Sequence, residues 1–318
     1  IPSYLDNKLS DLTKINYAKV GVGSIPYQSY VDGDITVRDV FIDDAWATYL
    51  VGTTRTGGKG IYVLNVTDPD TMTPANVIGE FTHPDLGLTF SKPQIIKMND
   101  SNSTATGAGR WAAVFGNGYN NTGTGSAQLF IVFLDDLANP IIIDTFKGNG
   151  DISCEALVNN CNGLSTPTLA DLDGDFIVDR IYAGDVQGNM WAFDVSSADS
   201  YYWDVAFVDN LAKKQPLFTA CSAACSETKD GVTTNTNRQP ITTAPQIQSH
   251  PSRSSFSEAP NVLVYFGTGQ YIADNDDETK DTQSFYTVWD KGSGGVIRDN
   301  LQSRSFVADV DDGSISVS

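Results

Sequence analysis

Short apolar runs recur along this chain, and most of them are bounded by glycine or other turn residues. Four runs end in glycine, at 45–52, 110–116, 178–184 and 261–267. A second apolar run follows each of them after a turn, at 60–66, 128–134, 188–195 and 284–290. A shorter run precedes three of them, in the strings KPQIIKM, TPTLADL and APQIQ. Runs of this length and composition predict β-strands, so each unit is expected to be a small antiparallel meander.

The repetition of this meander predicts the fold. The units recur after 64, 68 and 83 residues, measured from Gly52 to Gly116 to Gly184 to Gly267. Repetition of one meander is typical of a β-propeller, whose closure removes most exposed strand edges. The strands are almost continuously apolar, as expected when neighbouring blades cover both faces of each blade. A two-sheet sandwich is the main structural alternative, because it also contains many short strands.

Composition agrees with an all-β protein. The chain has 318 residues, of which 28 are glycine and 10% are aromatic, and few stretches have helical periodicity. This length suits one large or two ordinary domains, and no composition shift divides the chain. We therefore expect a single propeller domain over 1–318, with a leading segment at 1–30 and the blades at 31–318.

Charge limits the partners. The formal net charge of −19 disfavours binding to nucleic acid or to anionic lipid, and it favours cations. No apolar run reaches 18 residues, so the chain predicts no direct membrane insertion. It begins at Ile1 without a methionine, and we expect a fragment of a larger exported protein.

The cysteines indicate the same compartment. They form two close pairs, Cys154 with Cys161 and Cys221 with Cys225. Neither pair is a CxxC motif and no histidine lies nearby, so two short-range disulfides are a better interpretation than a zinc site. Disulfides point to an oxidising compartment.

One loop carries the clearest chemistry. Asp171, Asp173, Asp175 and Asp179 occupy positions 1, 3, 5 and 9 between two predicted strands. Calcium takes six to eight oxygen ligands, and alternating side chains of a tight loop can face one ion. The carbonyl of Ile177, at position 7, would supply a further oxygen. The spacing predicts a calcium site of the EF-hand-like kind; a solvated acidic turn is the alternative.

The loop departs from the helix–loop–helix form at two positions. Phe176 replaces the glycine expected at position 6, and Tyr182 replaces the bidentate glutamate expected at position 12. Asp179 must then close the ligand shell. The residues leave open whether the ion only holds the loop together or also regulates the protein.

Other candidate chemistry is weaker. His83 and His250 each lie beside a proline and form no known metal or catalytic motif. The run TTRTGGKG imitates a phosphate-binding loop but lacks its first glycine and its Ser or Thr, so it is interpreted as a hairpin turn. An acidic run at 274–281 lacks the calcium spacing and is expected to be an exposed loop. The five tryptophans fall mostly on predicted strands, where core packing is the usual role.

Longer strings resemble a known family. VDGDITVRDVF, GGKGIYVLNVTDP, FGNGYNN, PTLADLDGDFIVDRIYAGDVQGNMWAFDV and FGTGQYIADND, followed by DTQSFYTVWD, resemble the C-terminal propeller of the PilC/PilY family of type IV pilus tip proteins. The resemblance runs from about residue 30 to residue 290. It implies a modified β-propeller with about seven nominal blades. It also implies a calcium loop with Asp171, Asp173, Asp175 and Asp179 as carboxylate ligands.

The resemblance further implies a function. It predicts a non-enzymatic, calcium-binding factor for type IV pilus biogenesis and adhesion, in which calcium regulates pilus extension, retraction and twitching motility. The implied partners are pilins or minor pilins, the assembly machinery, and a receptor on a host cell or abiotic surface. The implied location is the periplasm, the outer membrane surface or the pilus tip. The alternatives are a calcium-dependent quinoprotein dehydrogenase and a lectin-like propeller.

Overall fold

The computed structural model describes most of the chain. The described residues are 2–14, 16–18, 21, 23–101, 109–121, 123–145, 162–221, 226–229, 232–235, 239–251, 260–272, 276–278, 280–304, 306–308 and 315–317. A 3₁₀ turn, η1 (Ser3–Leu5), and a short helix, α1 (Asp6–Leu12), come first. The helix packs on the first sheet, because Leu5 is buried and Lys8 Nζ donates to the Gly57 carbonyl at 2.6 Å.

Two four-stranded antiparallel meanders follow. The first contains β1 (Ile35–Ile42), β2 (Ala45–Thr53), β3 (Ile61–Asn65) and β4 (Val77–Phe81). The second contains β5 (Gln94–Met98), β6 (Arg110–Gly116), β7 (Gln128–Phe133) and β8 (Asp136–Asp144). In both sheets the spatial order of the strands is their order in the chain. The turn between β2 and β3 holds the TTRTGGKG run, as the hairpin interpretation predicts.

The third and fourth sheets repeat this plan with additions. The third is built on β9 (Thr168–Ala170), β10 (Arg180–Gly184) and β11 (Asn189–Asp194), and it is extended by β12 (Asp204–Val205), β15 (Phe218–Thr219) and β21 (Val296–Ile297). The fourth contains β18 (Gln246–Ser249), β19 (Val262–Gly267) and β20 (Phe285–Asp290). Trp191 and Phe193 lie on β11, an inner strand, and Gly184 ends β10, as predicted.

Short elements complete the described structure. The two-stranded pairs are β13 (Phe207–Val208) with β14 (Lys214–Gln215), β16 (Ser226–Lys229) with β17 (Val232–Asn235), and β22 (Phe306–Ala308) with β23 (Ile315–Val317). The remaining 3₁₀ turns are η2 (Pro69–Thr71), η3 (Pro74–Asn76), η4 (Ser200–Tyr202), η6 (Asp276–Glu278) and η7 (Arg298–Asn300).

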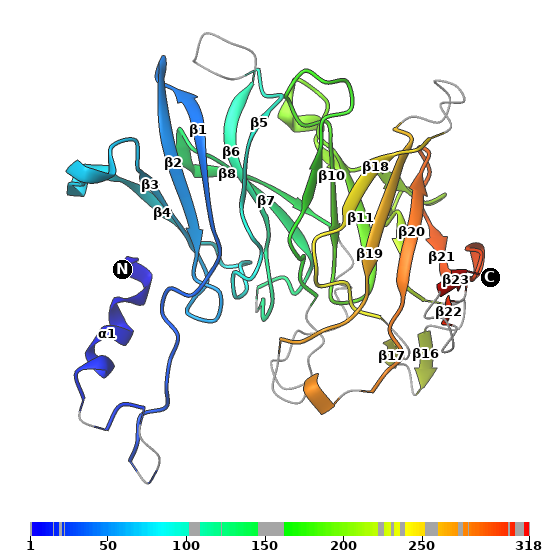
Figure 1. Ribbon diagram of the computed structural model, residues 1–318, viewed down its shortest axis with the longest axis horizontal. Helices are drawn as coiled ribbons and strands as arrows, with labels where there is room; N and C mark the ends of the chain where they lie inside the picture. The colour runs from blue at the N-terminus through cyan, green and yellow to red at the C-terminus, as the bar shows by residue number, and fades with distance from the viewer. Residues whose placement is uncertain are drawn as a thin grey trace.

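The four sheets stand one beside the next, from blue β1–β4 to orange β20 (Figure 1). Three hydrophobic cores fill the spaces between consecutive sheets. On β6, Phe115 belongs to the core shared with the first sheet and Val114 to the core shared with the third. On β11, Trp191 faces the second sheet and Met190 the fourth. This alternation buries both faces of each inner strand, as blade packing requires, and it excludes the two-sheet sandwich.

One detail of the predicted propeller needs correction. The sheets do not close into a ring: in the part of the chain that the structure describes, the first and fourth sheets lie at opposite ends of the row and share no hydrophobic core (Figure 1). The four meanders predicted from the sequence repeats correspond to the four sheets of three or more strands, and three two-stranded sheets accompany them in the described residues. The number of about seven blades, which came from the resemblance, stays a prediction.

Tryptophan packing is mixed. Trp191 and Trp203 are buried as predicted, but the side chain of Trp46 is 66% exposed. Trp46 is the second residue of β2, next to the turn from β1, and its ring makes an edge-type contact with Phe41, with 5.5 Å between the ring centroids. A position at the strand end explains why an apolar strand pattern did not bury it.

Of the four cysteines, only Cys221 lies among the described residues. Cys221 is buried and disulfide-bonded. Its predicted partner Cys225 lies outside the described residues, as do Cys154 and Cys161. The pairing therefore stays a prediction. Within the described ranges, no helix has the length and apolar character needed to cross a bilayer.

Candidate metal centre

The predicted calcium loop joins β9 to β10, the first and second strands of the third sheet. Its base is closed by pairing of Ala170 with Arg180 and by a 2.9 Å hydrogen bond from Asp179 N to the Ala170 carbonyl. Val178 N donates to the Lys97 carbonyl of β5 at 3.2 Å. The loop is thus attached to the second sheet as well as to its own.

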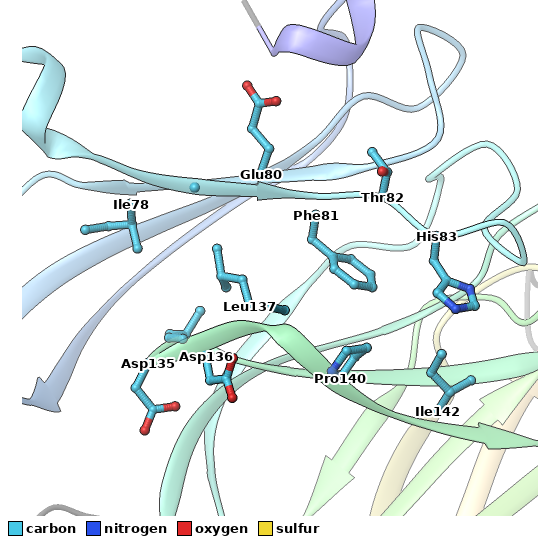
Figure 2. Close-up of a pocket in the computed structure, with 13 residues that line it drawn as sticks. Ile78, Glu80, Phe81, Thr82, His83, Asp135, Asp136, Leu137, Pro140 and Ile142 are labelled. Carbon is cyan, nitrogen blue, oxygen red and sulfur yellow. The ribbon is translucent and has the colours of Figure 1, made fainter.

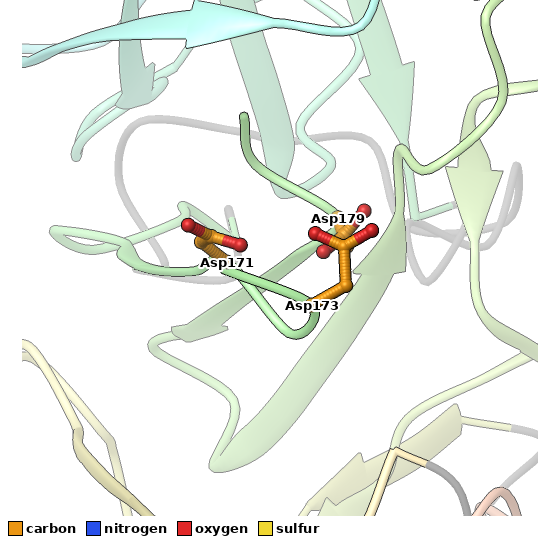
Figure 3. Close-up of side chains that lie close together, drawn as sticks. All are labelled: Asp171, Asp173 and Asp179. Carbon is orange, nitrogen blue, oxygen red and sulfur yellow. The ribbon is translucent and has the colours of Figure 1, made fainter. Parts of the chain in front are cut away.

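Three of the four predicted carboxylates meet. Carboxylate oxygens of Asp171, Asp173 and Asp179 all lie within 4.8 Å of one another, and Figure 3 shows the three side chains around one space. Asp175 is outside this group; its Oδ1 instead accepts a hydrogen bond from Ile177 N at 2.8 Å. The structure therefore brings three of the four predicted carboxylates together and does not bring Asp175 to them.

Backbone donors hold the three side chains in place. Asp171 accepts hydrogen bonds from Gly174 N at 2.7 Å and from Phe176 N at 2.8 Å. Asp179 Oδ2 accepts from Leu172 N at 2.7 Å, across the mouth of the loop. Because each carboxylate keeps further lone pairs, these bonds orient the oxygens and leave capacity for a cation.

Phe176, at position 6 of the loop, has the backbone conformation that glycine normally adopts there. Its φ is 68°, in the left-handed region where glycine is normally favoured, and Gly174 also has a positive φ of 87°. A bulky residue rarely adopts this conformation. The turn geometry expected of a calcium loop is therefore present without the expected glycine. The Phe176 side chain is 84% exposed.

The pKa shifts show an asymmetry within the cluster. Burial pushes the pKa of Asp171 upward, but hydrogen bonds from the Gly174 and Phe176 amides outweigh it, so that pKa lies below its ordinary value. Burial raises the pKa of Asp179, and the charges of Asp171, Asp173 and Asp175 raise it further, against a hydrogen bond from Leu172. Asp179 is thus the carboxylate for which a nearby cation would relieve the most unfavourable charge.

Tyr182, at position 12 of the loop pattern, has another role. It is fully buried in β10, and its hydroxyl donates to Asp290 Oδ2 at 2.9 Å. Arg180 also contacts this carboxylate, at 3.3 Å, and pairs with Asp194 at 3.1 Å. Sequence reasoning missed this buried cluster, because Asp290 is 110 residues from Arg180.

The other candidate residues do not gather into a site. His83 stacks on Phe81, and His250 stacks on Trp289 at 4.3 Å between ring centroids. Asp276, from the acidic run at 274–281, accepts a hydrogen bond from Ile272 N at 2.6 Å. Asp274 lies outside the described residues. Among the residues that were placed, only Asp171, Asp173 and Asp179 form a cluster with metal-ligand spacing.

Comparison with known proteins identifies the family. The sequence matches the PilY1 beta-propeller domain over residues 2–306. The chain belongs to the PilY1 β-propeller family. A structural match agrees: the crystal structure of the Pseudomonas aeruginosa PilY1 C-terminal domain aligns with a TM-score of 0.65 and 30% identity, covering 88% of this chain and 56% of that one.

Relatives of the PilY1 family extend this result. The type IV pilus biogenesis factor PilY1 homolog of Xylella fastidiosa is 36% identical over 270 residues, which are 83% of this chain and 16% of that protein. Type IV pilus biogenesis factor PilY1 of Pseudomonas aeruginosa is 33% identical over 326 aligned positions, covering 96% of this chain and 25% of that protein. The chain thus spans a quarter or less of the length of these relatives.

Proposed function

We propose that this chain is a calcium-binding domain of a type IV pilus biogenesis factor and that it acts without catalysis. The names of its PilY1 relatives support the pilus role over a quinoprotein dehydrogenase or a lectin. The calcium part rests on one observation: three carboxylates converge within 4.8 Å in a loop whose spacing is that of a calcium loop.

Electrostatics supports an ion at this place. In the described part of the chain, no lysine or arginine forms an ion pair with Asp171, Asp173 or Asp179. Three like charges held together by backbone hydrogen bonds repel one another, and a divalent cation would turn this repulsion into attraction. Calcium suits a flexible oxygen-rich loop better than magnesium, which requires near-octahedral geometry and gives up its water reluctantly.

The position of the loop suggests what the ion does. Val178 attaches the end of the loop to β5 in the second sheet, and Arg180, the next residue after Asp179, contacts Asp290 in the fourth. Calcium would thus order a segment that contacts three consecutive sheets. We propose that occupancy changes the rigidity of this region and thereby regulates pilus extension and retraction.

The remaining parts of the proposal follow from the family. The domain would be exported and would act in the periplasm, at the outer membrane surface or at the pilus tip. Its partners would be pilins or minor pilins and the assembly machinery, and it would support twitching motility and attachment to a host-cell or abiotic surface receptor. These roles are proposed for the full-length protein that contains this domain.

Calorimetric titration with Ca²⁺ and Mg²⁺ tests the site directly. We expect binding of Ca²⁺ in preference to Mg²⁺, and loss of that binding in Asp179→Asn, which keeps an acceptor for Leu172 N. Asp68→Asn is the matched control, because Asp68 is also a loop aspartate that accepts a backbone amide, at 3.2 Å from Asp70 N. Equal calcium affinity in all three proteins would refute the site.

A second experiment tests the biological role. Full-length protein carrying Asp179→Asn should change surface piliation or twitching in a piliated strain, whereas Asp68→Asn should not. Normal piliation despite lost calcium binding would reduce the ion to a structural element. Changed piliation with intact binding would separate the pilus role from the calcium site.

A further inference from the structure

A groove runs between the outer strands of the first two sheets. Its volume is about 890 Å³, and its walls are β4 with the residues that follow it, and β8 with the turn that precedes it (Figure 2). This size lies within the range of pockets that hold ligands or peptide side chains. The groove lies between the first and second sheets, whereas the predicted calcium loop joins two strands of the third sheet.

The inside of the groove is apolar. Ile78 and Phe81 point into it from β4, and Leu137, Pro140 and Ile142 come from the β8 side (Figure 2). The two walls touch where Leu137 packs over Gly79: a Cβ added to that glycine would lie 2.7 Å from Leu137 Cδ1. Ile78 remains 36% exposed beside this contact. An aliphatic side chain placed there would cover surface that is otherwise in water.

The two outer strands differ in their capacity to accept another strand. In the described structure β4 pairs only with β3, and β8 pairs only with β7. Strand β8 carries Pro140 and a register shift, which both hinder edge pairing. The shift in β4 falls at Ile78, and from Gly79 to Phe81 the strand pairs regularly with β3. The free edge of β4 is therefore the available one.

Two carboxylates lie near this edge. Glu80 points to the face of β4 opposite the groove (Figure 2), where it accepts hydrogen bonds from Ser3 N and Ser3 Oγ. These donors are neutral and leave the charge of Glu80 in place. Asp136 lies at the groove and accepts the Asn139 amide, at 2.9 Å. A guest strand beside β4 would thus meet apolar side chains on one face and a carboxylate on the other.

We propose that the β4 edge binds an extended segment of a partner protein in which aliphatic residues alternate with lysine or arginine. Side chains of a strand alternate between its two faces. The aliphatic residues would enter the groove against Ile78 and Leu137, and the basic residues would face Glu80. Addition of a strand to an exposed sheet edge supplies main-chain hydrogen bonds, and the alternating side chains supply specificity.

The test uses short synthetic peptides and the whole domain. A labelled peptide of alternating valine and lysine should bind, as measured by fluorescence anisotropy, and should slow amide hydrogen exchange at 77–81. Peptides of equal length that alternate valine with glutamate or glycine with lysine should bind at least about tenfold more weakly, a difference of about 1.4 kcal/mol. The first comparison isolates charge and the second isolates the apolar face.

Variants of the domain locate the site. Ile78→Ser and Glu80→Gln should each weaken binding of the valine–lysine peptide several-fold; the glutamine keeps an acceptor for Ser3. Val37→Ser on β1, at the opposite edge of the same sheet and 50% exposed, is the matched control and should bind normally. Equal binding of the glycine–lysine peptide, protection away from β4, or no binding of the valine–lysine peptide would each overturn the proposal.

Discussion

The aspartates at the two ends of strand β10 have opposite surroundings. At its start, Asp179 faces Asp171 and Asp173 within 4.8 Å. At its end, Asp185 is fully buried and receives hydrogen bonds of 2.8 Å from Asn162 Nδ2, Asn189 N, Asn189 Nδ2 and Trp191 Nε1. Protein donors satisfy Asp185, whereas the facing carboxylates of Asp171, Asp173 and Asp179 repel one another, and a bound cation would offset that repulsion. Counting the aspartates in a region is therefore a poor guide to metal binding. Whether their oxygens face hydrogen-bond donors or other carboxylates is a better one.

The pKa values of Asp185 and Asp179 are both raised, but for partly different reasons. Burial raises the pKa of Asp185, and hydrogen bonds from Asn162, Trp191 and Asn189 oppose this rise. Burial also raises the pKa of Asp179, but there the charges of neighbouring aspartates add to the rise. Only at the start of β10 does like-charge repulsion contribute, so only there would a bound ion remove an unfavourable term.

The positively charged side chain of Arg180 is close to the loop but already forms ion pairs elsewhere. Arg180 follows Asp179 directly, yet its side chain is buried and pairs with Asp194 and Asp290. Because Asp290 has no exposed surface, moving Arg180 toward the loop would leave a buried charge without its partner. The arrangement explains why the loop aspartates are not neutralised by their own neighbour in sequence.

The largest expected effect is at the end of β10. Asp185→Ala should destabilise the domain by about 3–4 kcal/mol, because the donors of Asn162, Asn189 and Trp191 would be left buried and unsatisfied. Denaturant unfolding measures this loss. Calcium affinity of the folded variant should change less than about threefold; a larger change would show that the two ends of β10 are coupled.

The next effect is at the start of the same strand. Asp179→Ala should abolish calcium binding, a loss of at least about 100-fold in affinity or about 2.7 kcal/mol. The domain should still fold, because the change is confined to one exposed loop. Calorimetry and thermal unfolding without calcium check the two parts. Unchanged calcium affinity would rule out Asp179 as a ligand, and unfolding of the calcium-free variant would contradict the confinement to the loop.

Sequence patterns predicted the strands of each meander better than they predicted the contacts between sheets. Strand β6 has the predicted bounds, 110–116, because its apolar residues and terminal glycine are all local signals. The run predicted at 178–184 begins as β10 only at Arg180, since Val178 and Asp179 bond to the neighbouring β5 and β9. The missing ring closure could not be predicted, because it depends on contacts between distant sheets.

The same limit applies to the site. The spacing of Asp171, Asp173 and Asp179 predicted their convergence, but Asp175 instead forms a local side-chain turn with Ile177 N. Such turns compete with long-range roles for aspartate, and spacing alone does not show which role prevails. Asp185 was missed because spacing did not show that the nearby Asn189 and Trp191 would turn their donors toward it, and its fourth donor, Asn162, is 23 residues away.

Substitution of Asp175 gives a third prediction, because it compares an aspartate outside the cluster with one inside it. Asp175→Asn should lower calcium affinity by at most about tenfold, or about 1.4 kcal/mol, because its carboxylate contributes long-range charge and lies outside the cluster. Parallel titrations of this variant and Asp179→Ala give the contrast. An equal loss in both would mean that calcium draws Asp175 into the shell and that the spacing described the bound loop correctly.

The smallest effect is expected at Phe176. Its left-handed conformation costs roughly 1–2 kcal/mol for a residue with a Cβ, whereas glycine at the same place loses about 0.5–1 kcal/mol through unfolded-state entropy. Phe176→Gly should therefore change the free energy of unfolding by less than about 1 kcal/mol and raise calcium affinity no more than about fivefold. Phe176→Ala separates the causes, since it removes the exposed ring but keeps the backbone strain. If alanine and glycine gave the same gain, the ring would be responsible; a gain with glycine alone would assign the effect to the turn that shapes the cluster.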